Sequence, residues 1–314
     1  MNILLAGGAG FIGTWAARLV QGGPHRVTVV DDLSGAAQHN VDWLEANGII
    51  LHQMSIREYV EKYTMEGYDA VVNLACRKMV ACTDPADAFD VNTVQAGLLA
   101  RAAVEAGVPR YVHISTGSVY GPKMQYRYVQ EADAPEPQGL YAASKLAGEH
   151  VVLDAISVDK VNTFLTTLRL FNVMGSGQAY GPTGGVLARW CAAVADLDTP
   201  PELHGHPWTK RMITDVVDVA RAILWMVEDK DQWDTPILNI GSCVQVELQQ
   251  LWDEVRKQSG TDLRLSQCGV RDGVFRVQCC NQLSRDLGMI YNENWQELVR
   301  STVQFYKELA NAPH

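Results

Sequence analysis

The amino-acid sequence predicts an α/β protein with a doubly wound parallel sheet and a smaller, interleaved C-terminal lobe. Three observations lead to this fold class. Short apolar runs recur without polar alternation, helix-like patterns lie between them, and the first run passes directly into a glycine-rich turn at residues 7–13. Continuous Val, Ile and Leu runs are typical of strands covered on both faces, and their alternation with helices favours a parallel sheet.

Six apolar runs are the expected strands, and the spacing of apolar residues predicts helices between and after them. The expected strands are 3–6, 27–30, 70–74, 111–115, 164–170 and 237–240. An apolar stripe at i, i+3, i+4, i+7 and i+8 falls on Ile12, Trp15, Ala16, Leu19 and Val20, and a second stripe, at i, i+4, i+5, i+8 and i+9, falls on Val94, Leu98, Leu99, Ala102 and Ala103. Such stripes indicate amphipathic helices, and we expect further helices at 246–258 and 295–309.

The composition of the sequence changes after residue 172. A stretch rich in glycine and proline covers 175–185, and Pro200 and Pro201 follow. Such stretches indicate loops, but no linker is long enough to separate independent domains. We therefore expect a sheet domain at 1–172, to which 208–242 returns, and a substrate-binding lobe made of 173–207 and 243–314.

The composition is that of a folded globular protein. Apolar residues make up 47% and charged residues 20%, and 26 basic against 36 acidic side chains give a net charge of −10. This charge argues against nucleic acid as a partner, and no run approaches a membrane span. The seven cysteines lack paired spacing, so we expect reduced thiols, no metal site and, without a signal-like start, a cytoplasmic location.

The turn after the first strand has the pattern of a dinucleotide site. Its glycines satisfy both GxxGxxG and GxGxxG. Glycine permits the tight turn and lets the backbone approach a pyrophosphate, which the N–H groups of the following helix then face. The residues expected to hold the dinucleotide here are Gly7, Gly10, Phe11, Ile12 and Gly13. This context predicts the Rossmann form of the doubly wound sheet.

The end of the second strand indicates which dinucleotide is bound. Asp31 lies 18 positions after Gly13, where an acid accepts hydrogen bonds from the adenosine ribose hydroxyls. Its charge would repel a 2′-phosphate, and no Lys or Arg lies between Arg26 and Arg57 to bind one. We therefore expect NAD rather than NADP, with the neighbouring Asp32 either in the same site or a solvated loop acid.

Tyr141 and Lys145 have the spacing of a proton-transfer pair. Four residues apart at the start of a predicted helix, they lie on one helix face. A nearby ammonium lowers the pKa of a phenol, because it stabilises the phenolate. Such a pair can take a proton from a hydroxyl whose carbon loses a hydride to NAD.

Together these motifs resemble the extended short-chain dehydrogenase/reductases, in the branch of NAD-dependent nucleotide-sugar epimerases and dehydratases. The segments that carry the resemblance are 7–13, Asp31, Leu74-Ala75, the Ser-Thr-Gly-Ser-Val-Tyr-Gly of 115–121, 141–145 and the Arg-Leu-Phe-Asn-Val of 169–173. The resemblance implies that Tyr141 is the acid/base, that Lys145 holds the nicotinamide ribose, and that Thr116 binds the sugar hydroxyl being oxidised. It also implies a homodimer formed by the helices from about Val94 and from Tyr141.

The resemblance extends to the remaining site residues. Further cofactor contacts would come from Leu74, Ala75, Lys78 and Asn92. A nucleotide-diphosphate sugar would be bound by Thr116, Ser118, Asn172, Gly185, Val186, Arg211 and Arg271. Met212 and Ile213 replace the family's Asp and aromatic residue after the phosphate-binding arginine, and Arg271-Asp272-Gly273 departs from its Arg-x-Gly-Asp order.

Two positions bear on the reaction. Dehydratases and decarboxylases of the family usually carry Glu two residues before the Tyr-Gly of 120–121, and sugar dehydratases often place Asp beside it. Ser118 and Gly117 stand there. Elimination of water needs such a carboxyl for proton transfer, whereas C4 epimerisation does not. This favours a nucleotide-sugar 4-epimerase acting on a substrate of the UDP-glucose or UDP-galactose kind. A 4,6-dehydratase or 4-keto reductase of the same family, and a non-catalytic NAD sensor, are the alternatives.

Overall fold

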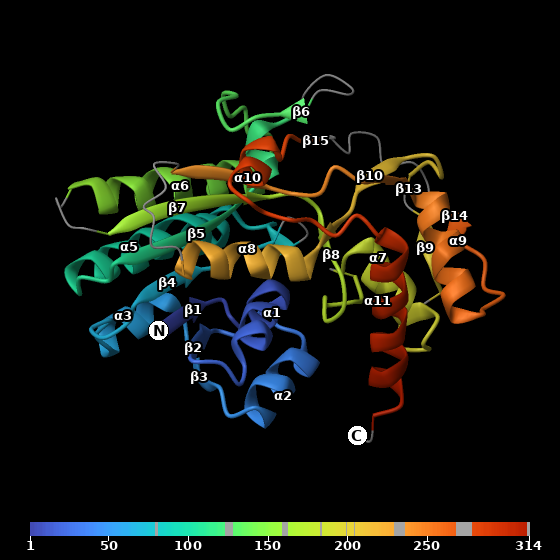
Figure 1. Ribbon diagram of the computed structural model, residues 1–314, viewed down its shortest axis with the longest axis horizontal. Coiled ribbons are helices and arrows are strands. Elements are labelled where there is room, and N and C mark those ends of the chain that lie inside the picture. Colours follow the sequence, from blue (N-terminus) through green and yellow to red (C-terminus); the bar gives the residue numbers. More distant parts are fainter. Residues whose placement is uncertain are drawn as a thin grey trace.

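A seven-stranded parallel sheet forms the centre of the computed structural model (Figure 1), which describes residues 1–78, 81–122, 128–158, 163–182, 184–198, 200–203, 205–228, 236–267 and 278–312. Its strands, in order across the sheet, are β12 (Ile237–Ile240), β7 (Phe164–Leu170), β5 (Arg110–Thr116), β4 (Ala70–Asn73), β1 (Asn2–Ala6), β2 (Arg26–Asp31) and β3 (Ile50–Gln53). The chain starts in the middle and winds outward in both directions, which confirms the predicted fold class.

Helices cover both faces of the sheet. On one face lie α1 (Phe11–Val20), α2 (Gln38–Ala46) and α8 (Val216–Glu228), and on the other lie α3 (Ile56–Lys62), α5 (Gln95–Glu105) and α6 (Leu140–Val158). Successive strand residues such as Leu4 and Leu5 are both buried, but each belongs to the core of a different face. This explains the apolar runs without alternation. None of the helices within the described ranges is long and apolar enough to cross a membrane.

The C-terminal part of the chain builds a second core beside the sheet. It contains α7 (Val186–Ala193), α9 (Leu248–Ser259) and α11 (Trp295–Ala310), around the edge-to-face rings of Trp190 and Trp252, whose centroids are 5.6 Å apart. Short strand pairs complete this part: β6 (Tyr128–Val129) with β15 (Gln278–Cys279), β8 (Val173–Met174) with β11 (Thr214–Asp215), β9 (Glu202–Leu203) with β14 (Ser266–Gln267), and β10 (Lys210–Met212) with β13 (Gln245–Glu247). The remaining short helices are α4 (Pro85–Phe89), η2 (Asp90–Val94), η3 (Gly117–Tyr120) and α10 (Gln282–Asp286).

Three elements differ from the sequence-based expectation. The edge strand β3 was not predicted, because it has four residues and Ile50 is 59% exposed, so no buried run marks it. The helix expected from residue 246 begins at Leu248, since Val246 pairs with Arg211 in a strand and Glu247 caps α9. The helix expected from about Val94 begins as α5 at Gln95, and it is preceded by the wider π-helical turn η2 at residues 90–94, in which Val94 is 47% exposed.

Side chains from the sheet domain hold the loop that leads into the second core. The indole Nε1 of Trp15 on α1 donates to the carbonyl of Ser176 at 2.6 Å, and the amide of Asn40 on α2 donates to the carbonyl of Gly177 at 3.0 Å. The next residue, Gln178, lines the pocket described below. The two parts of the chain are therefore joined at the edge of that pocket.

A buried ion pair fixes α6 to the sheet. Arg169 on β7 donates from Nε and Nη2 to the two carboxylate oxygens of Glu149, at 3.0 and 2.6 Å, and the two side chains are only 3% and 8% exposed. The Ser115 hydroxyl also donates to this carboxylate, and the guanidinium lies over the ring of Tyr120. Because α6 also carries Tyr141 and Lys145, this network sets where those side chains stand.

We expect Glu149→Ala to lower the free energy of unfolding by about 3 to 5 kcal/mol, because it leaves the Arg169 guanidinium buried without its counter-charge. The matched control is Glu297→Ala, which removes an exposed helical pair with Arg300 and should cost at most about 1 kcal/mol. Urea unfolding followed by circular dichroism measures both. Equal losses for the two variants would contradict a special role for the buried pair.

Candidate active site

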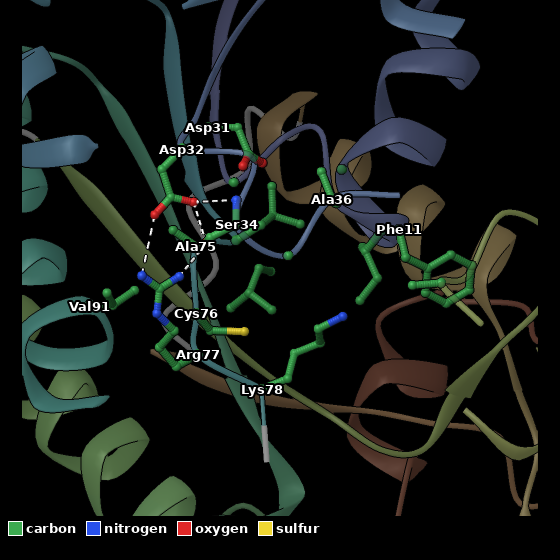
Figure 2. A pocket seen from close by; sticks show the side chains of 18 of the residues that line it. Phe11, Asp31, Asp32, Ser34, Ala36, Ala75, Cys76, Arg77, Lys78 and Val91 are labelled. Carbon is green, nitrogen blue, oxygen red and sulfur yellow. Dashed lines mark hydrogen bonds and ion pairs between the residues drawn. The ribbon is translucent and has the colours of Figure 1, made fainter. Parts of the chain in front are cut away.

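A pocket of about 320 Å³ lies at the carboxyl ends of the central strands. Its wall comes from the turn between β1 and α1, from the loops after β2 and β4, from the end of β5 and from the start of α6. Figure 2 shows this pocket with the residues that follow β2 on one side and those that follow β4 on the other. Ligand sites of open parallel sheets lie at this edge, where the strand order reverses.

The glycine turn leaves its backbone open to the pocket. A Cβ built on Gly7 would lie 2.5 Å from the backbone nitrogen of Ala75, and one built on Gly13 would lie 2.6 Å from the Cα of Gly8. Gly7 also has a φ of 78°, which favours glycine. No side chain caps the N-terminus of α1 at Gly10, and its first turn carries no acid. This end of the helix thus presents bare N–H groups to an anion, as a pyrophosphate requires.

The strand β2 ends at Asp31, and Asp32 follows it. Both aspartates lie at the rim of the same pocket. The Asp31 carboxylate accepts hydrogen bonds from the backbone N–H groups of Ala9, at 3.0 Å, and Leu33, at 2.8 Å. Burial raises the pKa of Asp31, and these hydrogen bonds oppose the rise. The carboxylate is therefore held by the glycine turn and its own loop, in the place where an adenosine ribose is bound in this fold.

Tyr141, Lys145 and Thr116 meet in the pocket with the glycine turn. Tyr141 and Lys145 come from the first turns of α6, and Thr116 ends β5. The Lys145 ammonium is buried and donates to the carbonyl oxygen of Ile114 at 2.6 Å. Thr116 lies close enough to Tyr141 to lower the pKa of its phenol. The three side chains expected to handle the proton thus share one cavity with the cofactor motif.

The pKa of Tyr141 differs from the sequence-based expectation. Burial raises it above the ordinary value, the thiols of Cys76 and Cys82 add to the rise, and the hydrogen bond with Thr116 opposes it. The sequence predicts that the ammonium of Lys145 lowers this pKa, but that ammonium is bonded to the carbonyl of Ile114, and burial dominates the pKa of the phenol. Burial also lowers the pKa of Lys145. Thr116 is the neighbour that lowers the pKa of Tyr141.

The two positions that lack a carboxyl lie directly beyond Thr116, in η3. The backbone N–H of Ser118 donates to the Thr116 hydroxyl oxygen, and that hydroxyl donates to the Ser118 Oγ, both at 3.2 Å. A Cβ on Gly117 would lie 2.4 Å from the ring of Phe171. Position 117 is thus closed to any side chain unless Phe171 moves.

Most of the expected site residues share this one pocket. Those that line it are Gly7, Gly10, Phe11, Ile12, Gly13, Asp31, Asp32, Leu74, Ala75, Lys78, Thr116, Tyr141, Lys145 and Asn172. Asn172 has a positive φ of 45° and donates from its amide to the carbonyl of Met212 on β10. The side chain of Asn172 therefore ties the pocket wall to the strand that carries Arg211.

Five expected site residues do not line this cavity: Asn92, Ser118, Gly185, Val186 and Arg211. Asn92 is buried in η2, where its Oδ1 accepts from the N–H of Arg77 at 2.7 Å and its Nδ2 donates to Ser144 at 2.9 Å. It thus fixes the loop after β4 against α6. Gly185 and Val186 begin α7, and Arg211 lies in β10. Arg271 falls outside the described residues.

Several pocket residues were missed by the sequence argument, above all Ser34, Arg77 and Gln178. Ser34 follows directly after the two aspartates, so its position near a ribose could have been read from the chain. Arg77 follows β4. Its side chain reaches the loop after β2 because a single strand, β1, separates β4 from β2 in the sheet. That contact is not encoded by local spacing.

Comparisons with known proteins agree with this geometry. The model of the NAD-dependent epimerase/dehydratase family matches residues 3–241. A UDP-glucose 4-epimerase of Corynebacterium glutamicum is 25% identical over 83% of this chain and 81% of its own length, and a dTDP-D-glucose 4,6-dehydratase of Mus musculus is 26% identical over 98% and 89%. The crystal structure of a UDP-glucose 4-epimerase from Thermotoga maritima with UDP-glucose is 25% identical, with a TM-score of 0.87 over 98% of this chain and 99% of that one.

The family match spans the whole pocket, from the glycine turn to β12. The open glycine backbone, the uncapped α1 and the ribose-side aspartate suit the dinucleotide that the family uses. The chain therefore belongs to the NAD-dependent epimerase/dehydratase family, and its cofactor is NAD.

Proposed function

We propose that this protein is a nucleotide-sugar 4-epimerase that acts on a substrate of the UDP-glucose or UDP-galactose kind. The observation that carries the proposal is the meeting of Thr116, Tyr141 and Lys145 in the glycine-lined pocket, with no carboxyl at positions 117 and 118. The relatives include a dehydratase as well as epimerases, so the family alone leaves the reaction open. The missing carboxyl favours the epimerase.

In this mechanism the side chains of the protein transfer one proton and return it. NAD, which the glycine turn and Asp31 would hold, would supply the acceptor for a hydride from C4 of the sugar and the source of its return to the opposite face. Tyr141 takes the proton from the 4-hydroxyl and later gives it back, so no net oxidation occurs. Thr116 orients that hydroxyl and favours the phenolate through its hydrogen bond. Lys145, anchored on Ile114, keeps a positive charge beside the reacting groups.

The remaining roles belong to the same proposal. Ser118, Asn172, Gly185, Val186, Arg211 and Arg271 would bind the nucleotide sugar, and Lys78 and Asn92 would serve the cofactor side. The second core around Trp190 and Trp252 supports a substrate lobe at 173–207 and 243–314, beside a cofactor domain at 1–172 with 208–242. The six cysteines in the described ranges are free thiols, which supports a cytoplasmic location.

We expect Tyr141→Phe to lower turnover by several powers of ten while NADH binding stays within about threefold of wild type, because only the ionisable hydroxyl is lost. The assay offers UDP-, dTDP- and GDP-sugars in deuterated water and identifies the products by NMR. Hydride return should give a C4 epimer without deuterium. Deuterium at C5 would instead indicate elimination or 5-epimerisation, and an absence of turnover with every sugar would favour a non-catalytic NAD sensor.

We expect Thr116→Val to move the ascending limb of the rate–pH profile to higher pH, by up to about one unit. The hydrogen bond with Thr116 lowers the pKa of Tyr141, so its loss leaves less phenolate at a given pH. Thr116→Ser keeps the hydroxyl and should keep the position of the limb. A profile that merely drops in height, unshifted, in Thr116→Val would show that Thr116 does not act on the Tyr141 pKa.

We also propose a homodimer formed through the helices from about Val94, which are η2 and α5, and from Tyr141, which is α6. Val94 on η2 and Leu153 on α6 are each 47% exposed, and Phe89, directly before η2, is 38% exposed, so large apolar side chains are available to a second copy of the chain. We expect Val94→Glu to convert dimers to monomers in sedimentation equilibrium, because it places a charge in the apolar contact. Ile290→Glu, which changes an exposed side chain away from these elements, should leave the dimer intact.

A further inference from the structure

Arg77 links three segments at the adenosine end of the pocket. Its Nε donates to the Asp87 carboxylate of α4 at 2.8 Å, its Nη2 pairs with Asp32 at 3.4 Å, and its Nη1 donates to the Ser34 hydroxyl. The side chain is 22% exposed and stands between the loops after β2 and β4, as Figure 2 shows. A guanidinium with three directed partners is a fixed group rather than a free surface charge.

The loop that Arg77 ties down is the ribose loop. It begins with Asp31, which accepts ribose hydroxyls in this fold, and it continues through Asp32 and Ser34, which line the pocket. Asp32 also accepts from the backbone N–H of Ser34 at 2.9 Å, so Asp32 and Ser34 turn together toward Arg77. The backbone of Arg77 itself is bonded to Asn92. Both ends of this link are therefore anchored.

The charge of Arg77 is already balanced. The hydrogen bond with Asp87 raises the pKa of Arg77, with Asp32 contributing further. Burial alone would raise the pKa of Asp32, but Ser34 and Arg77 lower it overall. A 2′-phosphate placed here would have to break these pairs while facing the carboxylates of Asp31 and Asp32. The other nearby cation, Lys78, points away from Arg77, toward the side of the pocket where Phe11 lies (Figure 2).

We propose that Arg77 is a specificity-determining residue for the cofactor: held by Asp32 and Asp87, it fixes the ribose loop for NAD and withholds its charge from the 2′-phosphate of NADP. The preference for NAD over NADP thus has two sources. The Arg77 guanidinium is already paired with two carboxylates and is not offered to the 2′-phosphate, and Asp31 repels that phosphate. The inference concerns the cofactor alone and is independent of which sugar is converted.

The test measures dissociation constants of NADH and NADPH by their fluorescence on purified protein freed of retained nucleotide, with thermal unfolding as the control for folding. The wild type should bind NADH at least about tenfold more tightly than NADPH. Asp32→Asn should lower the ratio of the NADPH dissociation constant to the NADH dissociation constant about tenfold, because the freed Arg77 guanidinium can pair with the 2′-phosphate. Arg77→Gln should weaken NADH binding about fivefold, since the ribose loop loses its tie.

The double variant Asp32→Asn with Arg77→Gln is the decisive measurement. If the unmasked guanidinium binds the 2′-phosphate, the double variant loses the gain in NADPH affinity that Asp32→Asn produces. A gain that persists without Arg77 would come from the lost repulsion of Asp32 and would overturn the proposal. Arg57→Gln removes an arginine paired with Asp90 outside the pocket wall and should change neither constant. Equal weakening in Arg57→Gln and Arg77→Gln would also overturn it.

Discussion

The site depends on backbone segments that approach one another too closely for any side chain to stand between them. Gly7 lies against Ala75 at the end of β4, and Gly13 lies against Gly8 within the turn. A third crossing has the same character, because a Cβ on Gly148 of α6 would lie 2.2 Å from the carbonyl oxygen of Asn92. The first brings the glycine turn to the end of β4, the second closes the turn itself, and the third brings α6 to η2. The glycine turn and the pair Tyr141 and Lys145 thus line the same pocket.

Hydrogen bonds and a buried ion pair then fix the segments that the glycines allow to approach one another. Glu149 and Arg169 lock α6 to β7 two turns below Tyr141, while Asn92 connects the loop after β4 to Ser144 on the same helix. Lys145 is bonded to the sheet through Ile114. Each contact joins α6 to a different neighbour, so the helix cannot shift without breaking several of them. This rigidity matters because a proton-transfer pair works only if its geometry is set before the substrate arrives.

The parts of the site that the sequence predicted are the parts that local rules determine. The glycine turn and the pair Tyr141 and Lys145 follow from spacing within a few residues, Asp31 follows from its place at the end of the second strand, and all of them line one pocket. The parts that it missed depend on contacts between distant segments. Arg77 reaches Asp32 across β1, and Val94 is exposed because a π-helical turn shifts the face of the helix. The raised pKa of Tyr141 comes from burial, which no spacing rule reports.

The absence of a carboxyl beside Thr116 is built into the packing as well as into the sequence. Phe171 occupies the space next to Gly117 and stacks on Tyr120, with the ring centroids 6.2 Å apart, and Tyr120 in turn lies under the Arg169 guanidinium. An acidic side chain at 117 would therefore displace a ring that supports the same network that anchors α6. The Asp that sugar dehydratases often carry at 117 would require this corner to be repacked, whereas the proposed C4 epimerisation needs no side chain at that position. The packing around Gly117 is thus in keeping with the proposed chemistry.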